Sequence, residues 1–243
     1  MSGPPSRARA PLTWTSTCER SLEGHAMDDA KRRKQRHSAS PPVPEVERDQ
    51  QPSTLSDCRR CALWRNATQP VAGEGPQRPR IMLIGEQPGD SEDIEGRPFV
   101  GPAGTLLDKA LEEAGMTRTD VFVTNAVKHF KWTPRGKRRM HKTPGQREID
   151  ACAYWLEQEL ATHQPEVIVA LGATALKAVL DDAHARLQDA MGSAIESNGR
   201  KVVATYHPSF ALRAPDPATR QRVYAAIVAA LREANSLTRE KKR

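Results

Sequence analysis

Short apolar runs alternate with amphipathic stretches along the C-terminal three-quarters of the chain, and this alternation predicts its fold. Four runs are short, apolar and bounded by polar or glycine residues, as buried strands are. They are Arg80–Gly85, Asp120–Asn125, Glu166–Leu171 and Lys201–Tyr206. Asn198-Gly199 precedes the last run and is typical of a hairpin turn. These runs predict a sheet of four strands.

The stretches between and after these runs carry apolar residues at helical spacing. The predicted helices are Pro102–Gly115, Gly145–His163, Ala173 to about Leu180, and about Pro217–Asn235. In the first of them one face collects Leu106, Leu107, Ala110, Leu111 and Ala114, and Gly115 supplies a stop signal. Strands that alternate with helices form a parallel sheet covered on both faces. We therefore predict an α/β protein with three α/β/α layers and a central, mainly parallel, four-stranded sheet.

The first 52 residues show no such period. They are rich in Pro, Ser, Arg, Glu and Gln and include Lys31-Arg32-Arg33-Lys34-Gln35-Arg36, which predicts a disordered basic tail at 1–52. The basic run is either an inert solvated segment, an address, or a source of nonspecific DNA affinity. The folded domain is expected at 53–237, followed by a charged C-terminal tail at 238–243.

Net charge, hydropathy and cysteine content indicate which partners and which cell compartment to expect. The 243 residues include 37 Lys+Arg and 30 Asp+Glu, and the resulting net charge of +7 favours a polyanionic partner. No apolar run approaches the roughly 18–20 residues that span a bilayer, and the N-terminus lacks the apolar segment of an export signal. We expect a cytoplasmic, nucleoid-associated monomer with no membrane association. Its four cysteines then read as metal ligands or core residues, not disulfides.

Polar signatures follow the predicted strands directly. Gly85-Glu86-Gln87-Pro88-Gly89-Asp90 follows the first strand, Asn125 ends the second, and His207-Pro208-Ser209 follows the last. Ligands of such sheets bind at the carboxyl ends of the strands. We therefore expect these residues to gather at one rim.

A strongly basic loop is predicted between Trp132 and Pro144. It contains Lys137-Arg138-Arg139-Met140-His141, whose charge density excludes a core position and favours solvent or a polyanion. Read alone, it is better explained as a solvated loop with an incidental histidine.

A possible metal site is indicated by Cys58-Arg59-Arg60-Cys61, which precedes the helix-like stretch Ala62-Leu63-Trp64-Arg65. Cys152 lies far along the chain. Three cysteines make an incomplete site, so a zinc or a redox interpretation competes at this point.

Taken in order, these motifs resemble the uracil-DNA glycosylase superfamily, within it the iron–sulfur, family 4-like branch, and within that branch the UdgX type. The resemblance runs from about Leu55 to Leu231. It is carried by Gly85–Asp90, Gly96-Arg97-Pro98-Phe99-Val100-Gly101-Pro102-Ala103-Gly104, Thr124-Asn125-Ala126-Val127-Lys128-His129, Lys137–His141 and His207-Pro208-Ser209. Met140 stands where the family more often has isoleucine, a residue of similar size and polarity.

The resemblance implies an enzyme that flips uracil out of DNA and excises it. Phe99 would stack on the base, Asn125 would read its N3–H and O4 edge, and His207 would donate to O2 of the leaving uracil. On local evidence alone, each is also explained as a core, turn or strand-end residue. Further substrate contacts are expected from Gln87, Asp90, Arg138 and Ser209.

The UdgX type implies that uracil is released while the enzyme stays covalently bound to the abasic site. His141 would attack C1′, Glu86 would stabilise the cationic sugar, and Arg138 and Arg139 would hold phosphates, with Arg139 also orienting His141. Single-stranded uracil-containing DNA is the expected partner, with duplex DNA as the alternative. A turnover glycosylase and a non-catalytic iron–sulfur nucleic-acid-binding module remain as other hypotheses.

The same resemblance implies a structural [4Fe–4S] cluster. In the iron–sulfur branch a cysteine follows the lysine of the Asn-x-Val-Lys stretch, and this chain has His129 there. The expected ligands are Cys58, Cys61, His129 and Cys152, with Cys18 as the competing fourth ligand.

Overall fold

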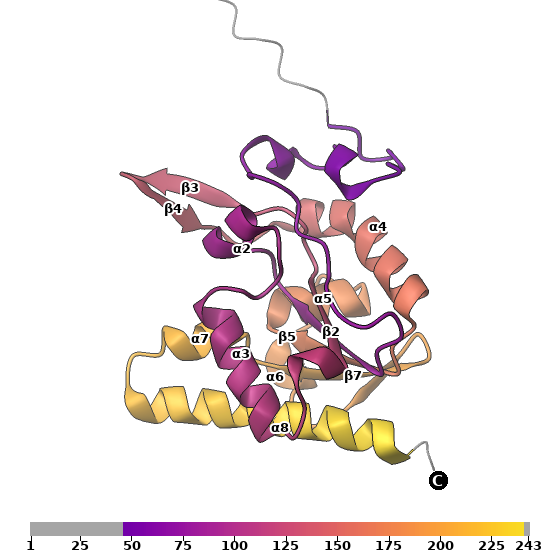
Figure 1. The fold of residues 1–243 in the computed structure, drawn as a ribbon, viewed down its shortest axis with the longest axis vertical. Coiled ribbons are helices and arrows are strands. Elements are labelled where there is room, and N and C mark those ends of the chain that lie inside the picture. The colour runs from indigo at the N-terminus through magenta and orange to yellow at the C-terminus, as the bar shows by residue number, and fades with distance from the viewer. Residues whose placement is uncertain (1–45, 241–243) are drawn as a thin grey trace, which may run out of the picture. The chain divides into compact units, whose positions relative to one another are not determined.

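A mixed sheet forms the centre of the domain in the computed structural model, which describes residues 46–240 (Figure 1). The strand order is β2-β1-β5-β7-β6. Four strands are parallel, and they are β1 (Ile81–Gly85), β2 (Val121–Asn125), β5 (Val167–Leu171) and β7 (Arg200–Thr205). Most of the predicted tail, including Cys18, lies outside the described residues.

The sheet holds one strand more than the four predicted. Strand β6 (Ile195–Ser197) pairs antiparallel with β7 at the edge. Asn198 and Gly199 both have positive φ angles, 49° and 73°, and form the predicted turn between these strands. Three residues are too few to show an alternating pattern, which is why the sequence signals the turn but not the strand before it.

Helices cover both faces of the sheet, and the alternation of side chains along each strand explains how. On β1, Ile81 and Leu83 belong to a core cluster with α3 (Pro102–Glu113) and α8 (Pro217–Glu240). Met82 and Ile84 point the other way, into a cluster with α4 (Gln146–His163), α5 (Ala173–Leu180) and α6 (Leu187–Ala190). The three-layer α/β/α arrangement is thus confirmed. Helix α8 continues past the predicted Asn235 as far as Glu240.

Short elements complete the described chain. They are the 3-10 helices η1 (Leu55–Asp57), η2 (Ala62–Arg65) and η3 (Arg118–Asp120) and the α-helices α2 (Asp90–Glu95) and α7 (Pro208–Leu212). Helices α2 and α7 follow β1 and β7 directly and bring polar loops to the rim of the sheet. No helix within residues 46–240 is long and apolar enough to cross a membrane.

The predicted basic loop is in fact a β-hairpin. Strands β3 (Trp132–Arg135) and β4 (Arg138–His141) pair antiparallel, with Trp132 opposite His141. The expectation of a loop was wrong because both strands are short and mostly exposed, so no apolar alternation marks them. Figure 1 shows the hairpin projecting from the body beside α2. His141 therefore lies at the base of the hairpin and the basic residues at its tip.

Candidate active site

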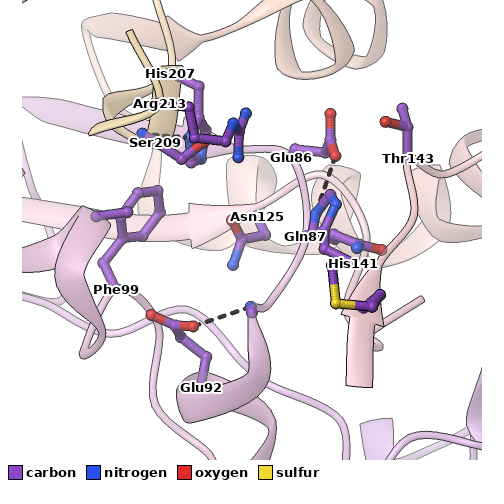
Figure 2. A pocket seen from close by; sticks show the side chains of 13 residues that line it. Glu86, Gln87, Glu92, Phe99, Asn125, His141, Thr143, His207, Ser209 and Arg213 are labelled. Atoms are coloured by element: carbon purple, nitrogen blue, oxygen red, sulfur yellow. Dashed lines mark hydrogen bonds and ion pairs between the residues drawn. The ribbon is translucent and has the colours of Figure 1, made fainter. Parts of the chain in front are cut away.

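A cavity of about 450 Å³ opens at the carboxyl ends of the parallel strands. This is the rim predicted from the sequence, and most of the expected site residues line it (Figure 2). The lining residues come from the loop after β1 with α2, the end of β2, the loop before α3 with the first turn of α3, the base of the hairpin, and the segment after β7 with α7. They are Glu86, Gln87, Gly89, Glu92, Phe99, Ala103, Asn125, Met140, His141, Thr143, His207, Ser209 and Arg213.

Asn125 lines this cavity, and its amide oxygen, Oδ1, is buried without a hydrogen-bond partner in the described chain. The residue is 2% exposed. A Cβ on Gly85, the neighbouring residue in the sheet, would lie 2.4 Å from that oxygen. Only glycine there leaves room for the amide. A buried carbonyl without a partner costs free energy, so Asn125 is held in this position at a cost to stability.

A buried lysine holds the backbone of Asn125 in place. Lys128, 0% exposed, donates through Nζ to the backbone oxygen of Asn125 at 2.8 Å, to Thr124 Oγ1 at 2.7 Å and to Glu159 Oε2 at 2.7 Å. All three ammonium protons therefore find acceptors. The turn that follows β2 is fixed by these bonds.

Phe99 lies in the cavity wall with a strained backbone. Its φ is 55°, a region that aromatic residues rarely adopt. A Cβ on Gly104 would lie 1.8 Å from the carbonyl oxygen of Phe99, so the start of α3 can pack against this turn only with glycine there. The Phe99 ring stacks 5.7 Å from the His207 ring, centroid to centroid. Strain held by surrounding structure is typical of functional sites.

His207 is neutral and its tautomer is defined by its neighbours. The backbone N–H of Ser209 donates to His207 Nδ1 at 3.1 Å, and the Ser209 hydroxyl lies 2.8 Å from the same atom. The proton of the neutral ring is therefore on Nε2. Burial, together with nearby Arg213 and His141, lowers the pKa of His207 to about 4. His207 thus offers an uncharged N–H donor, and Ser209 holds it in place.

His141 and Glu86 lie next to each other in the cavity wall, with 3.3 Å between Nε2 and Oε1 (Figure 2). Burial lowers the pKa of His141 below 6.5, and Arg213 adds to this, although the Glu86 carboxylate opposes it. The other oxygen of Glu86 accepts a hydrogen bond of 2.6 Å from Thr174. His141 is accordingly a neutral imidazole beside a carboxylate that is itself anchored.

The amide of Gln87 closes the base of the hairpin. Its Nε2 donates to the carbonyl oxygens of Lys131 at 3.2 Å and Lys142 at 3.1 Å, and its Oε1 accepts from the N–H of Lys131 at 3.0 Å. Although Gln87 was expected to contact the base, its amide is engaged with the backbone on both sides of the hairpin. Its role in this structure is to hold the segment that carries His141.

Arg139 joins the hairpin to α2. Its guanidinium contacts Asp93 and Asp90 carboxylates, each at 2.5 Å, and donates to Thr68 Oγ1 at 3.1 Å. The guanidinium also lies over the Phe130 and Trp132 rings. Arg139 and Asp90, both expected to contact substrate, are thus paired with each other. Arg138 is exposed on the same strand.

Several residues that shape the site were not anticipated. Glu92, 8% exposed, accepts the N–H of Gly89 at 3.0 Å and that of Gly101 at 2.8 Å, which ties the first loop to the Phe99 loop. Asp93 is fully buried beneath Arg139. Glu92 and Asp93 were not predicted because a run of acidic residues normally indicates a solvent-exposed face. Arg213 lies beyond the histidine motif and carried no sequence signal of its own.

The expected cluster ligands are all buried. Cys58, Cys61 and Cys152 are free thiols, and His129 is 3% exposed. A hydrogen bond between the Cys61 and Cys152 thiols lowers the pKa of Cys61 and raises that of Cys152. His129 Nδ1 is buried without a partner among residues 46–240. In this same range, no three His, Cys, Asp or Glu side chains form a group that could hold a single metal ion.

Several known proteins are similar to this chain in sequence. The family model of the uracil DNA glycosylase superfamily matches residues 72–232. The type-4 uracil-DNA glycosylase of Thermotoga maritima is 43% identical over 160 residues, which cover 65% of this chain and 80% of that protein. The type-4 enzyme of Pyrobaculum aerophilum is 38% identical over 170 residues, covering 66% and 82%. The chain belongs to the uracil DNA glycosylase superfamily. A third relative, the type-4 enzyme of Sulfurisphaera tokodaii, is 36% identical over 171 residues, covering 65% and 73%.

The superfamily match contains the whole cavity, since every lining residue falls between Glu86 and Arg213. Cys58 and Cys61 lie N-terminal to the matched range. The superfamily match therefore covers the cavity. It does not cover Cys58 and Cys61.

Proposed function

We propose that this protein is a uracil-DNA glycosylase of the UdgX type, which excises uracil and stays covalently attached to the abasic site through His141. The observation that carries the excision is the unpaired amide oxygen of Asn125 in the cavity wall. The names of the type-4 relatives support the same reaction. Adduct formation rests on the second observation, a neutral His141 at the cavity beside Glu86.

Base recognition follows from the donors and acceptors around the cavity. A flipped uracil presents an N3–H donor and the O2 and O4 acceptors. Asn125 has a free carbonyl for N3–H, and the Nε2–H of His207 suits O2, where negative charge develops as the base leaves. Phe99 supplies an apolar surface for the ring. Flipping costs a few kcal/mol, which these contacts offset.

The chemical step then transfers C1′ from uracil to the protein. The N1–C1′ electron pair leaves with the base, which becomes an anion next to His207 and later takes a proton from solvent. A lone pair of the neutral His141 ring forms the new bond to C1′, and the ring becomes an imidazolium. Glu86 stabilises the positive charge, first on the sugar and then on the imidazolium. Because an alkylated imidazolium is a poor leaving group, the adduct persists.

The tip of the hairpin suits a phosphate backbone. Arg135, Lys137 and Arg138 are exposed there, and Arg139 holds the hairpin against α2 through Asp93 and Asp90. Exposed cations on the hairpin that carries His141, beside a cavity sized for one base, favour DNA with a flipped nucleotide. We expect single-stranded DNA to bind more readily, because no base pair has to be broken.

Cys58, Cys61, Cys152 and His129 fit the iron–sulfur cluster proposed from the sequence. They are buried, three are free thiols, and Nδ1 of His129 has no hydrogen-bond partner in the described chain. Each ligand of a four-iron cluster binds a different iron, so the ligands need not converge on one point as those of a single ion do. Such a cluster would tie the η1–η2 segment to α4 and to the segment that follows β2.

A denaturing gel with a uracil-containing single-stranded oligonucleotide tests the proposal. We expect a heat-stable shifted band, with mass spectrometry placing the sugar on the peptide that contains His141. The variant His141→Ser should lose the band and release an alkali-cleavable abasic site. A cross-link that maps elsewhere, or that survives in His141→Ser, would refute the assignment of the nucleophile.

A turnover glycosylase is the second candidate. It is favoured by the 44% exposure of the His141 side chain, which leaves water a path to the sugar. In that case the wild-type protein would release the abasic site with no shifted band. If neither a band nor an abasic site forms, the protein is instead a non-catalytic nucleic-acid-binding module.

A further inference from the structure

Strand β5 ends at the rim of the cavity, yet the loop that follows it lacks any residue in the cavity wall. This loop instead affects the cavity through contacts with residues that line it. Gly172 turns the chain with a φ of 95°, and a Cβ there would lie 3.2 Å from Cβ of His207. The loop therefore passes closely behind the site and places Thr174 in the first turn of α5.

The Thr174 hydroxyl donates a hydrogen bond of 2.6 Å to Glu86 Oε2. Thr174 is 7% exposed, so this hydroxyl cannot turn to bulk solvent. A carboxylate at the N-terminal end of a helix is also favoured by the backbone dipole. One oxygen of Glu86 is thus fixed by α5, and the other is left to face His141 Nε2 at 3.3 Å.

We infer that Thr174 is a positioning residue that keeps Glu86 directed at His141 and thereby favours covalent capture over release of the abasic site. The inference rests on the proposed function. Without the hydroxyl, Glu86 can rotate about its side-chain bonds, and its carboxylate can then orient water toward C1′. Attack by water and attack by His141 compete for the same cationic sugar.

Substitution by valine provides the test, because it removes the hydroxyl and keeps the shape of the side chain. For Thr174→Val we expect adduct formation to slow about tenfold, equivalent to about 1.4 kcal/mol, while the share of free abasic site rises. Thr174→Ser retains the hydroxyl and should behave like the wild type. Thr205→Val is the matched control, since Thr205 is buried and its hydroxyl has no partner among the described residues.

The pH profile separates positioning from packing. Burial lowers the pKa of His141 most, Glu86 raises it and Arg213 lowers it further. The charge of His141 in turn lowers the pKa of His207. If Glu86 swings away in Thr174→Val, the pKa of His141 falls further. The acid midpoint of the adduct rate should then move to lower pH. A variant that is merely less stable would keep the wild-type midpoint.

Two results would overturn the inference. One is a Thr174→Val protein with the rate, product ratio and midpoint of the wild type. The other is an equal loss in Thr174→Val and Thr205→Val with no shift in the midpoint. If the wild type itself forms no adduct, covalent capture fails as the proposed function. Thr174 is then judged by excision alone, which should slow in Thr174→Val because Glu86 is no longer held at the cationic sugar, and should stay unchanged in Thr205→Val.

Discussion

Replacing Asn125 by leucine should change activity and stability in opposite directions. Leucine has nearly the shape of asparagine but cannot pair with uracil, so the N3–H of a bound base would be buried without a partner. That costs about 1–3 kcal/mol, or roughly a 5- to 160-fold loss in kcat/KM for excision. In the free protein the substitution removes the unpaired Oδ1. Its removal should stabilise the fold by about 1 kcal/mol or more.

Single-turnover excision from a uracil-containing oligonucleotide measures the first effect, and thermal unfolding the second. For a domain of this size, about 1 kcal/mol corresponds to a Tm shift of roughly 2–4 °C. Asn235→Leu is a suitable control, because Asn235 lies on α8 and its Nδ2 donates to the carbonyl oxygen of Ala114 at 3.2 Å. That variant should lose stability and keep its activity. The reasoning is refuted if Asn125→Leu excises normally, or if it is destabilised as Asn235→Leu is.

Three further measurements address other parts of the molecule. Initial DNA affinity should fall steeply with salt, and Arg138→Ala should flatten the log–log slope by about 0.7–0.9; an unchanged slope would exclude a phosphate contact. The purified protein should absorb broadly at about 400 nm, as iron–sulfur centres do. His129→Ala should lose this absorbance, whereas His129→Cys and Cys18→Ser should keep it; a colourless, fully active wild type would rule the cluster out. Finally, His207 binds a proton near pH 4 when folded and near 6.5 when unfolded. Stability should therefore fall as pH drops from 6.5 toward about 4, and less so in His207→Gln; parallel curves would contradict the assigned pKa.

The layers of this fold were predictable because their cause is visible in the sequence. Buried parallel strands such as Ile81–Gly85 are continuous apolar runs, and α3 shows one clear apolar stripe. The hairpin gave no such signal, since Pro134 interrupts β3 and both strands face water. Short polar helices such as α2 are missed for the same reason.

The rim of the site was predictable from topology, whereas the partners of its residues were not. Asn125, His207 and Glu86 follow strands, and parallel strands end on the same side. Nothing in the chain indicated that Arg139 would meet Asp93, or that the amide of Gln87 would bind backbone. Such pairs depend on the angle at which separate loops approach one another, and spacing along a sequence does not encode that angle.

Because the hairpin is closed by hydrogen bonds at its base, its outer part can change in sequence and length. The backbone of Lys131 and Lys142 is held by Gln87, and the N–H of Lys142 donates to the carbonyl oxygen of Lys131 at 2.9 Å. His141 sits just inside this junction, so the tip at 135–138 can vary without displacing it. Doubling the length of a loop costs only about 0.6 kcal/mol. The tip is therefore a place where insertions, or grafted segments that read particular DNA structures, can be accepted while the chemistry at the base stays intact.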